Sequence, residues 1–229
     1  MMPRFDFSRA FGRSLVIGLF IGLVSSRGAW AAGPERPQRG GSVAGSQSAR
    51  IAIPVYGSIL QMGLPEGWKL AHEQATPAQY LAEFTPAGQG VDNWQEMVTV
   101  QGFRGLADKA GMTPKIFLRR IAEGLNQTCP RQVLGYSLGE RTIDGRPATL
   151  ALLGCASLPA KPGQPARSEF ALYVAMTSGA DLVLLQKARR GPPLAAEKPP
   201  LQGAELEAFW SVLQPLRLCS GGAGNPRCP

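Results

Sequence analysis

Residues 92–96, Asp-Asn-Trp-Gln-Glu, form the segment whose side chains are best suited to binding or chemistry. A tryptophan flanked by carboxyl groups can line a ligand pocket, and two suitably spaced carboxyl groups can hydrolyse a glycosidic bond. Asp92, Trp94 and Glu96 are therefore the predicted ligand-binding residues. No catalytic residue is assigned, but a hydrolase that uses Asp92 and Glu96, with Glu83 nearby in the sequence, is an alternative hypothesis.

Other chemistries have little support in the sequence. The single histidine, His72, and the lack of any Gly-x-Ser-x-Gly segment argue against a serine nucleophile activated by histidine. Glycine-rich segments lack the Lys-Ser/Thr pair of a phosphate-binding loop. The four cysteines include no Cys-x-x-Cys pair, which argues against zinc. We predict neither a metal nor a cofactor, and we favour a protein that is not an enzyme.

Residues 93–103, NWQEMVTVQGF, favour a β-strand, and this affects where the acid points. Alternate side chains of a strand share a face, so Trp94, Glu96, Val98 and Val100 should lie together. Val98 and Val100 suit the face that the main helix covers. Glu96 is then expected on the side of the core, where a carboxylate is costly unless it is paired or hydrogen-bonded.

Two interpretations of Glu96 follow from this position. In the structural one, Glu96 caps the start of the main helix or pairs with Arg119 or Arg120, and so ties the helix to the sheet. In the functional one, Trp94 and Glu96 line a pocket where the strand begins. The group that Glu96 contacts decides between the two interpretations.

Periodicity and turn residues place this segment within a series of strands. Pro65-Glu66-Gly67 and Thr76-Pro77 are turn signals between short apolar runs, and the strands on either side of Thr76-Pro77 should pair. The predicted strands are IAIPVYGSILQMG (51–63), LPEGWKLAHE (64–73), AQYLAEFTP (78–86) and NWQEMVTVQGF (93–103).

The main helix has clear start and stop signals. Thr113 can cap the free amides, and Pro114 fits the first helical position. Apolar residues recur every four positions from Phe117 to Leu125, which places them on one face. The helix should end near residues 126–129, because a proline follows.

Two hairpins and a closing helix follow. Asp144-Gly145 is a two-residue turn between apolar runs, and Ser178-Gly179-Ala180 joins a second pair of strands. The segment GAELEAFWSVLQPL (203–216) has apolar residues on one side, as a surface helix does. The predicted fold class is α+β, with a mostly antiparallel sheet of about six to seven strands and a central and a C-terminal helix packed on it.

The order of these elements and a few motifs resemble a known fold. The motifs are Leu-Pro-x-Gly-Trp from Leu64, Phe-x-Pro from Phe84 and Phe-Trp-x-x-Leu from Phe209. With the central helix and the hairpins, they resemble the PsbP-like α/β/α sandwich, named for the extrinsic photosystem subunit. The segment from Asn93 to Thr99, Asn-Trp-x-Glu-Met-Val-Thr, is similar to one shared by an uncharacterised group of secreted proteobacterial proteins.

The resemblance covers roughly residues 60–218. The resemblance implies a binding or assembly accessory more often than an enzyme. This is an analogy at the level of the fold, since one fold hosts many functions. No residue matches an ion-handling position, so the photosystem family's role in retaining manganese, calcium and chloride is not carried over.

The N-terminus has the pattern of a secretory signal peptide. Three arginines precede the apolar run LVIGLFIGLV (15–24), and Ala29-Trp30-Ala31 supplies small residues for cleavage. Ten apolar residues make about 15 Å of helix, short of the roughly 30 Å of a bilayer core. We predict cleavage after Ala31 and a periplasmic or secreted protein. An uncleaved segment that retains the chain as a subunit of a membrane complex is an alternative.

Composition divides the rest of the chain. Residues 32–50 are Gly, Pro, Ser, Gln and Arg with little to bury, and we predict a flexible linker. Residues 51–218 should form a single α+β domain, and residues 219–229 a tail closed by a disulfide.

The basic residues favour an anionic envelope partner over nucleic acid. Residues 1–31 hold four arginines and one aspartate, so their removal lowers the net charge from +8 to +5. The basic residues are scattered, and Lys187, Arg189 and Arg190 are expected on a solvated surface, so no nucleic-acid binding is predicted. We expect an accessory whose partner is an envelope protein or a cell-wall or membrane-surface ligand.

All four cysteines, Cys129, Cys155, Cys219 and Cys228, lie in the exported part. An even number in an oxidising compartment indicates two disulfides. Three connectivities are possible. We favour Cys129–Cys155 and Cys219–Cys228, because the second pair would close the Gly-rich tail on itself.

Overall fold

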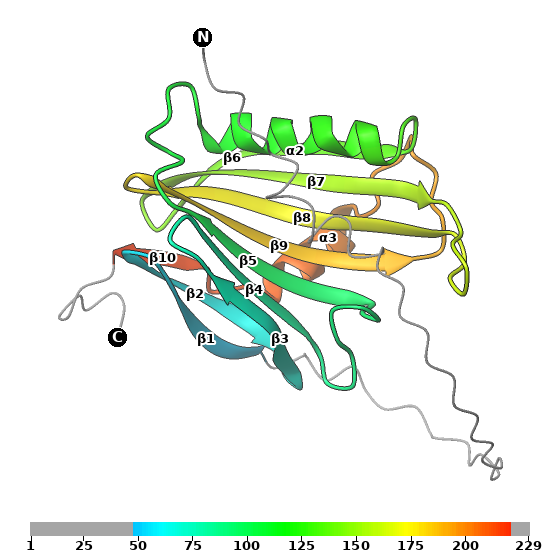
Figure 1. Cartoon of the computed structure of the whole chain (residues 1–229), viewed down its shortest axis with the longest axis horizontal. Helices are drawn as coiled ribbons and strands as arrows, with labels where there is room; N and C mark the ends of the chain where they lie inside the picture. Colours follow the sequence, from blue (N-terminus) through cyan, green and yellow to red (C-terminus); the bar gives the residue numbers. More distant parts are fainter. Residues whose placement is uncertain (1–47, 221–229) are drawn as a thin grey trace. The chain divides into compact units, whose positions relative to one another are not determined.

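The computed structural model describes residues 48–220, which belong to one compact unit. Its framework is a seven-stranded sheet with the strand order β3-β4-β5-β9-β8-β7-β6, antiparallel throughout (Figure 1). The α+β class with a mostly antiparallel sheet is therefore confirmed. The strands are β3 (Trp68–Ala75), β4 (Gln79–Pro86), β5 (Glu96–Phe103), β6 (Val133–Ile143), β7 (Arg146–Leu158), β8 (Arg167–Ser178) and β9 (Asp181–Gly191).

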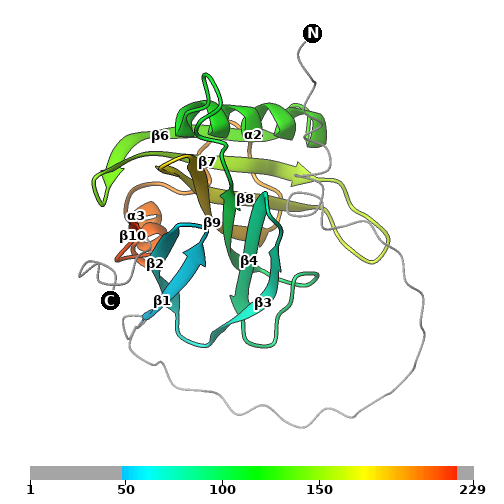
Figure 2. The ribbon, with the colours of Figure 1, turned by 60° about the vertical axis from the view of Figure 1, so that its left-hand side comes forward.

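A second, three-stranded sheet was not predicted. Its order is β1-β2-β10, and Figure 2 shows β1 and β2 beside β3 and β4. The prediction of one strand over 51–63 is wrong, because the chain reverses at Tyr56-Gly57, where Tyr56 takes a φ of +53°. The strands are β1 (Ser48–Val55), β2 (Ser58–Pro65) and β10 (Arg217–Ser220).

The three-stranded sheet packs on one face of the large sheet. Leu60 and Met62 of β2 lie in one buried cluster with Val98 and Val100 of β5. The prediction that the main helix covers Val98 and Val100 is therefore wrong. The unpredicted sheet takes that place, because β1 and β2 together present an apolar face that must be buried.

Hydrogen bonds also join the two sheets. The hydroxyl groups of Ser58 in β2 and Ser178 in β8 bond to each other in the interior. Arg146 of β7 donates through Nε to the carbonyl oxygen of Leu218, 2.8 Å away, and through Nη2 to Ser220 Oγ at 2.9 Å. β10 is thus tied to β7 as well as to β2.

The main helix, α2 (Pro114–Thr128), lies on the opposite face of the large sheet, over β6, β7 and β8 (Figure 1). It starts as predicted, because Thr113 Oγ1 accepts from the amide of Ile116 and Pro114 takes the first helical position. Its Phe117 ring lies 5.1 Å from that of Phe103, which points away from the three-stranded sheet.

The closing helix, α3 (Gly203–Ser211), shares a face of the large sheet with the three-stranded sheet. Phe209 of α3 is buried in a cluster with Leu152, Phe170 and Leu172 of β7 and β8. Both faces of the large sheet are therefore covered, which explains the near-continuous apolar runs of β7, β8 and β9. Within residues 48–220, no helix is both long and apolar enough to cross a membrane.

The predicted Cys129–Cys155 disulfide is present and joins the end of α2 to β7, with the two Cα atoms 5.9 Å apart. Cys219 is also disulfide-bonded, and its predicted partner Cys228 lies outside the described residues. The predicted signal peptide and most of the predicted linker lie outside them too.

Gly154 of β7 has no room for a side chain. A Cβ there would lie 2.3 Å from the carbonyl oxygen of Glu169 and 2.4 Å from the Cα of Phe170. Backbone atoms in a central strand cannot move aside easily, so we expect Gly154→Ala to lower the free energy of unfolding by about 2 kcal/mol or more. Gly135→Ala in β6 is the matched control, since nothing lies within 4 Å of its Cβ. Equal urea midpoints for the two variants would contradict the expectation.

Candidate functional site

The predicted site residues gather around two consecutive arginines near the end of β9. Alternate residues of a strand point to opposite faces, so Arg189 and Arg190 project to different sides of the large sheet. Each arginine organises a separate cluster of charged and aromatic side chains. The prediction that Lys187, Arg189 and Arg190 lie on a solvated surface is wrong, because the lysine is buried and both arginines are partly buried and ion-paired.

Glu96 belongs to the cluster around Arg189, on the face of α3. Arg189 Nε donates to Glu96 Oε1 at 2.9 Å, and the two residues are direct partners in the ladder of β5 and β9. Arg189 Nη1 also donates to Glu205 Oε1 of α3 at 3.2 Å. The expected pairing of Glu96 with Arg119 or Arg120 is therefore wrong, because α2 lies on the other face. About a third of each side chain of the Glu96–Arg189 pair is exposed, so solvent weakens its contribution to stability.

Lys187 lies beside this cluster and is only 4% exposed. Its Nζ lies 4.1 Å from the centre of the Phe209 ring, and the guanidinium carbon of Arg189 lies 4.9 Å from the same centre. Burial lowers the pKa of Lys187, and the nearby Glu96 opposes this shift. The aromatic face therefore stabilises two cations and holds α3 against the sheet.

Trp94 and Asp92 belong to the cluster around Arg190, on the other face. The guanidinium carbon of Arg190 lies 3.6 Å from the centre of the Trp94 ring, and Trp94 is 4% exposed. Arg190 Nε donates to Glu169 Oε2 at 2.9 Å. Burial lowers the pKa of Arg190, while Glu169 and, more weakly, Asp92 raise it. Asp92 itself is exposed.

Trp94 and Glu96 therefore do not line one pocket. β5 begins only at Glu96, so Trp94 precedes the strand and is not bound by its alternation. The backbone amide of Arg190 donates to the carbonyl oxygen of Gln95 at 2.8 Å. Gln95 is thus bonded to β9 and separates Trp94, in one cluster, from Glu96, in the other. The structure brings Asp92 and Trp94 together around Arg190 and places Glu96 apart from them.

The amide side chains of the same segment serve the loop itself. Asn93 Oδ1 accepts from the amide of Gly90 at 2.7 Å, and Gln89 Oε1 accepts from the amide of Gln95 at 2.7 Å. Thr85 Oγ1 donates to the carbonyl oxygen of Gln89 at 3.1 Å. These side chains form hydrogen bonds with backbone amide and carbonyl groups of the loop that packs Trp94 against the sheet.

A row of polar residues crosses the sheet on the face of α2. His72, Glu83, Thr99, Gln186 and Tyr173 are successive ladder partners in β3, β4, β5, β9 and β8. Ladder partners share a face, so their side chains lie side by side. His72 at the edge is exposed, and the other four are buried. This row could not be predicted from the sequence, because it depends on the order of strands that are distant in the sequence.

Glu83 is the unusual member of this row. It is 2% exposed, and its Oε1 has no hydrogen-bond partner among the described residues. Burial raises the pKa of Glu83, and the neighbouring His72 only partly opposes the shift. The carboxyl group therefore holds its proton to a higher pH than an exposed glutamate does.

The carboxylates beside the two arginines form hydrogen bonds within the chain. The carboxylates of Glu96 and Glu169 accept hydrogen bonds from arginines of the same chain. Between Ser48 and Ser220, no three His, Cys, Asp or Glu side chains lie close enough together to hold a metal ion.

No protein-family model matches the sequence, and no curated protein matches it. Among solved structures, the cyanobacterial PsbP protein (CyanoP) of Synechocystis sp. PCC 6803 is 15% identical, with 66% of this chain and 85% of that one covered and a TM-score of 0.39. The Ran-binding protein Mog1p of Saccharomyces cerevisiae is 13% identical, with 76% and 96% covered and a TM-score of 0.46.

LpqN of Mycobacterium tuberculosis, a protein involved in cell envelope biogenesis, is 15% identical, with 77% and 92% covered and a TM-score of 0.37. A PsbP protein is thus among the matched structures. The similarity of residues 93–99 to the secreted proteobacterial group stays a prediction.

Glu83 should make stability depend on pH in a defined direction. Its pKa is raised in the folded state, so its contribution to stability is full at low pH and is lost as the pH rises through the raised pKa. Glu83→Gln keeps the shape and removes the titration. We expect the variant to match the wild type at about pH 4 and to be more stable than the wild type at about pH 8, as measured by urea unfolding at both pH values.

Glu66→Gln is the control for this comparison. Glu66 is exposed in the turn between β2 and β3, so its substitution should leave the pH profile unchanged. A Glu83→Gln profile that runs parallel to that of the wild type would show that Glu83 does not titrate differently in the folded state.

Proposed function

We propose that the chain is an exported, periplasmic protein that acts as a non-enzymatic binding or accessory component of the cell envelope. Its partner would be an envelope protein or a cell-wall or membrane-surface ligand. The signal-peptide pattern of residues 1–31 supports export. The Cys129–Cys155 disulfide supports it independently, because such bonds persist in oxidising compartments and are rare in the cytosol.

The observation that carries the non-enzymatic part is the separation of the two predicted acids. Glu96 pairs with Arg189 on one face of the sheet, whereas Asp92 lies in the loop beside Arg190 on the other. A glycosidase needs two carboxyl groups about 5 to 9.5 Å apart that flank one bond. Two acids divided between the faces of a sheet do not meet this requirement, so no observation favours the hydrolase alternative.

The partner's chemistry follows from the charge of the processed chain. Cleavage after Ala31 leaves a net charge of +5, which favours a partner with a negative surface. The membrane-retained alternative depends on residues 1–31, which lie outside the described residues. N-terminal processing separates this alternative from the leading proposal.

Export is tested by fractionation. We expect osmotic shock to release the wild-type protein with Ala32 at its N-terminus, because small residues at positions 29 and 31 direct cleavage. Ala31→Phe is the matched control, since a bulky residue blocks cleavage and should retain the protein in the membrane fraction. A wild-type protein that stays in that fraction with its first residues intact would support the membrane-retained alternative.

The accessory role is tested by activity and by capture. We expect neither the wild type nor Glu96→Gln to release products from purified peptidoglycan, since Glu96 is held by Arg189. Crosslinking in intact periplasm should instead yield a discrete complex whose partner is acidic or anionic. Hydrolysis by the wild type that Glu96→Gln abolishes would overturn the non-enzymatic role.

A further inference from the structure

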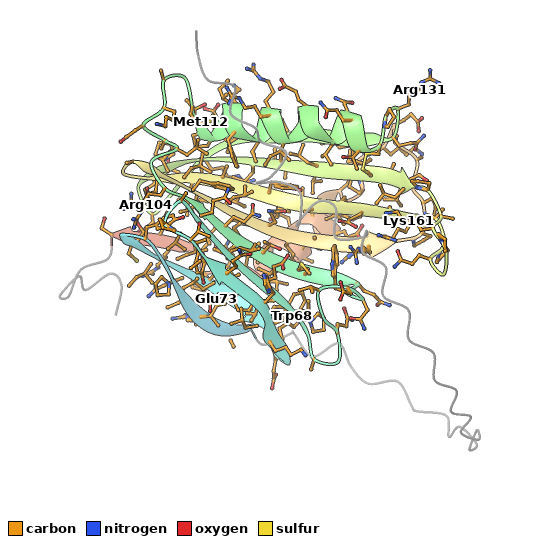
Figure 3. All side chains as sticks on the ribbon, in the orientation of Figure 1. Trp68, Glu73, Arg104, Met112, Arg131 and Lys161 are labelled. Carbon is orange, nitrogen blue, oxygen red and sulfur yellow. A yellow bond between two sulfur atoms is a disulfide. The ribbon has the colours of Figure 1, made fainter. Side chains whose placement is uncertain are left out.

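A cavity of about 700 Å³ opens at the start of α2. It lies at the opposite end of β8 from Glu169 and the Arg190 cluster, near Met112, which Figure 3 labels. Its volume is in the range of small-molecule sites, about 300 to 1,000 Å³. The lining residues are Met112 to Lys115 at the start of α2, Glu140 to Thr142 of β6, Pro147 to Thr149 of β7 and Thr177 of β8.

Thr149 is a buried polar side chain that lines this cavity. The residue is 7% exposed and lies on the face of the sheet that α2 covers. Within residues 48–220 its hydroxyl oxygen has no hydrogen-bond partner, and it is not one of the enclosed unpaired atoms, so it is open to the cavity. Thr149 therefore presents one donor and one acceptor to whatever occupies the cavity.

The start of α2 adds positive potential to the same cavity. Thr113 satisfies the amide of Ile116, and Pro114 has no N–H, so the amide of Lys115 remains for an external partner. The first turn contains no acidic residue to offset the positive end of the helix dipole.

The charged side chains at the mouth also favour an anion. Glu140 is the acid among the lining residues, and its Oε1 lies 3.2 Å from Lys115 Nζ, so its charge is already matched. Arg141 adds a second cation. The lining therefore carries one net positive charge in addition to the helix dipole.

We propose that this cavity binds a small ligand through an oxyanion, a phosphate or a carboxylate group. The amide of Lys115 and the hydroxyl of Thr149 would donate to the oxyanion, as helix N-termini do to anions elsewhere. The threonines around the cavity would contact the rest of the ligand. This proposal goes beyond the accessory role and does not depend on export or on a protein partner.

The test is a titration of the ¹⁵N-labelled, disulfide-bonded protein, followed by its amide resonances. Inorganic phosphate and acetate are the probes in separate titrations, with chloride keeping the ionic strength constant. We expect saturable shifts confined to residues 113–117 and to the strands around Thr149. The probe that saturates at the lower concentration identifies the preferred oxyanion.

Thr149→Val removes the hydroxyl and keeps the shape. It should weaken binding about tenfold, the effect of losing one hydrogen bond to a charged group. Thr99→Val is the matched control, because Thr99 is a similarly buried threonine on the same face, in β5. It should leave the affinity unchanged.

If Thr149→Val does not fold, Lys115→Gln on the exposed surface of α2 serves instead and should also weaken binding. Shifts that never saturate, that chloride reproduces, or that both threonine variants retain in full would overturn the proposal. The fractionation experiment is unaffected by any of these results, so the oxyanion site and the exported accessory role can fail separately.

Discussion

Alternation of side chains along the strands governs this molecule, because its central sheet is covered on both faces. α2 covers one side, and α3 with the three-stranded sheet covers the other. Consecutive residues of β9 must therefore enter different environments. Arg189 turns toward α3 and Arg190 toward the loop that carries Trp94. One strand thus supplies the cation of both clusters.

Each buried cation in these clusters is stabilised by an aromatic face or a carboxylate. Lys187 lies over Phe209, and Arg190 lies over Trp94 and pairs with Glu169. A buried charge without such partners would be costly, so the clusters hold α3 and the loop before β5 in place. This stabilising role explains the charged and aromatic residues there. The cavity at the start of α2 is a separate region, where the amide of Lys115 and the hydroxyl of Thr149 are available as donors.

Local signals predicted several elements correctly because the chemistry that specifies them lies within a few residues. Thr113 and Pro114 set the start of α2, since a cap and a residue without an N–H satisfy the helix end. Asp144-Gly145 closes the hairpin of β6 and β7, with both residues at positive φ. The reversal at Tyr56-Gly57 was missed because Tyr56 adopts a backbone conformation that tyrosine rarely takes.

The environment of Glu96 could not be obtained in this way. Residue types and spacing identified the segment and showed that its acid would need a partner. The partner is Arg189, 93 residues away, and it becomes a neighbour only because β9 inserts between β5 and β8. Periodicity along a strand defines two faces but not which element covers each, since that depends on long-range pairing. The polar row at Glu83 and the cavity beside Thr149 depend on the same order of strands.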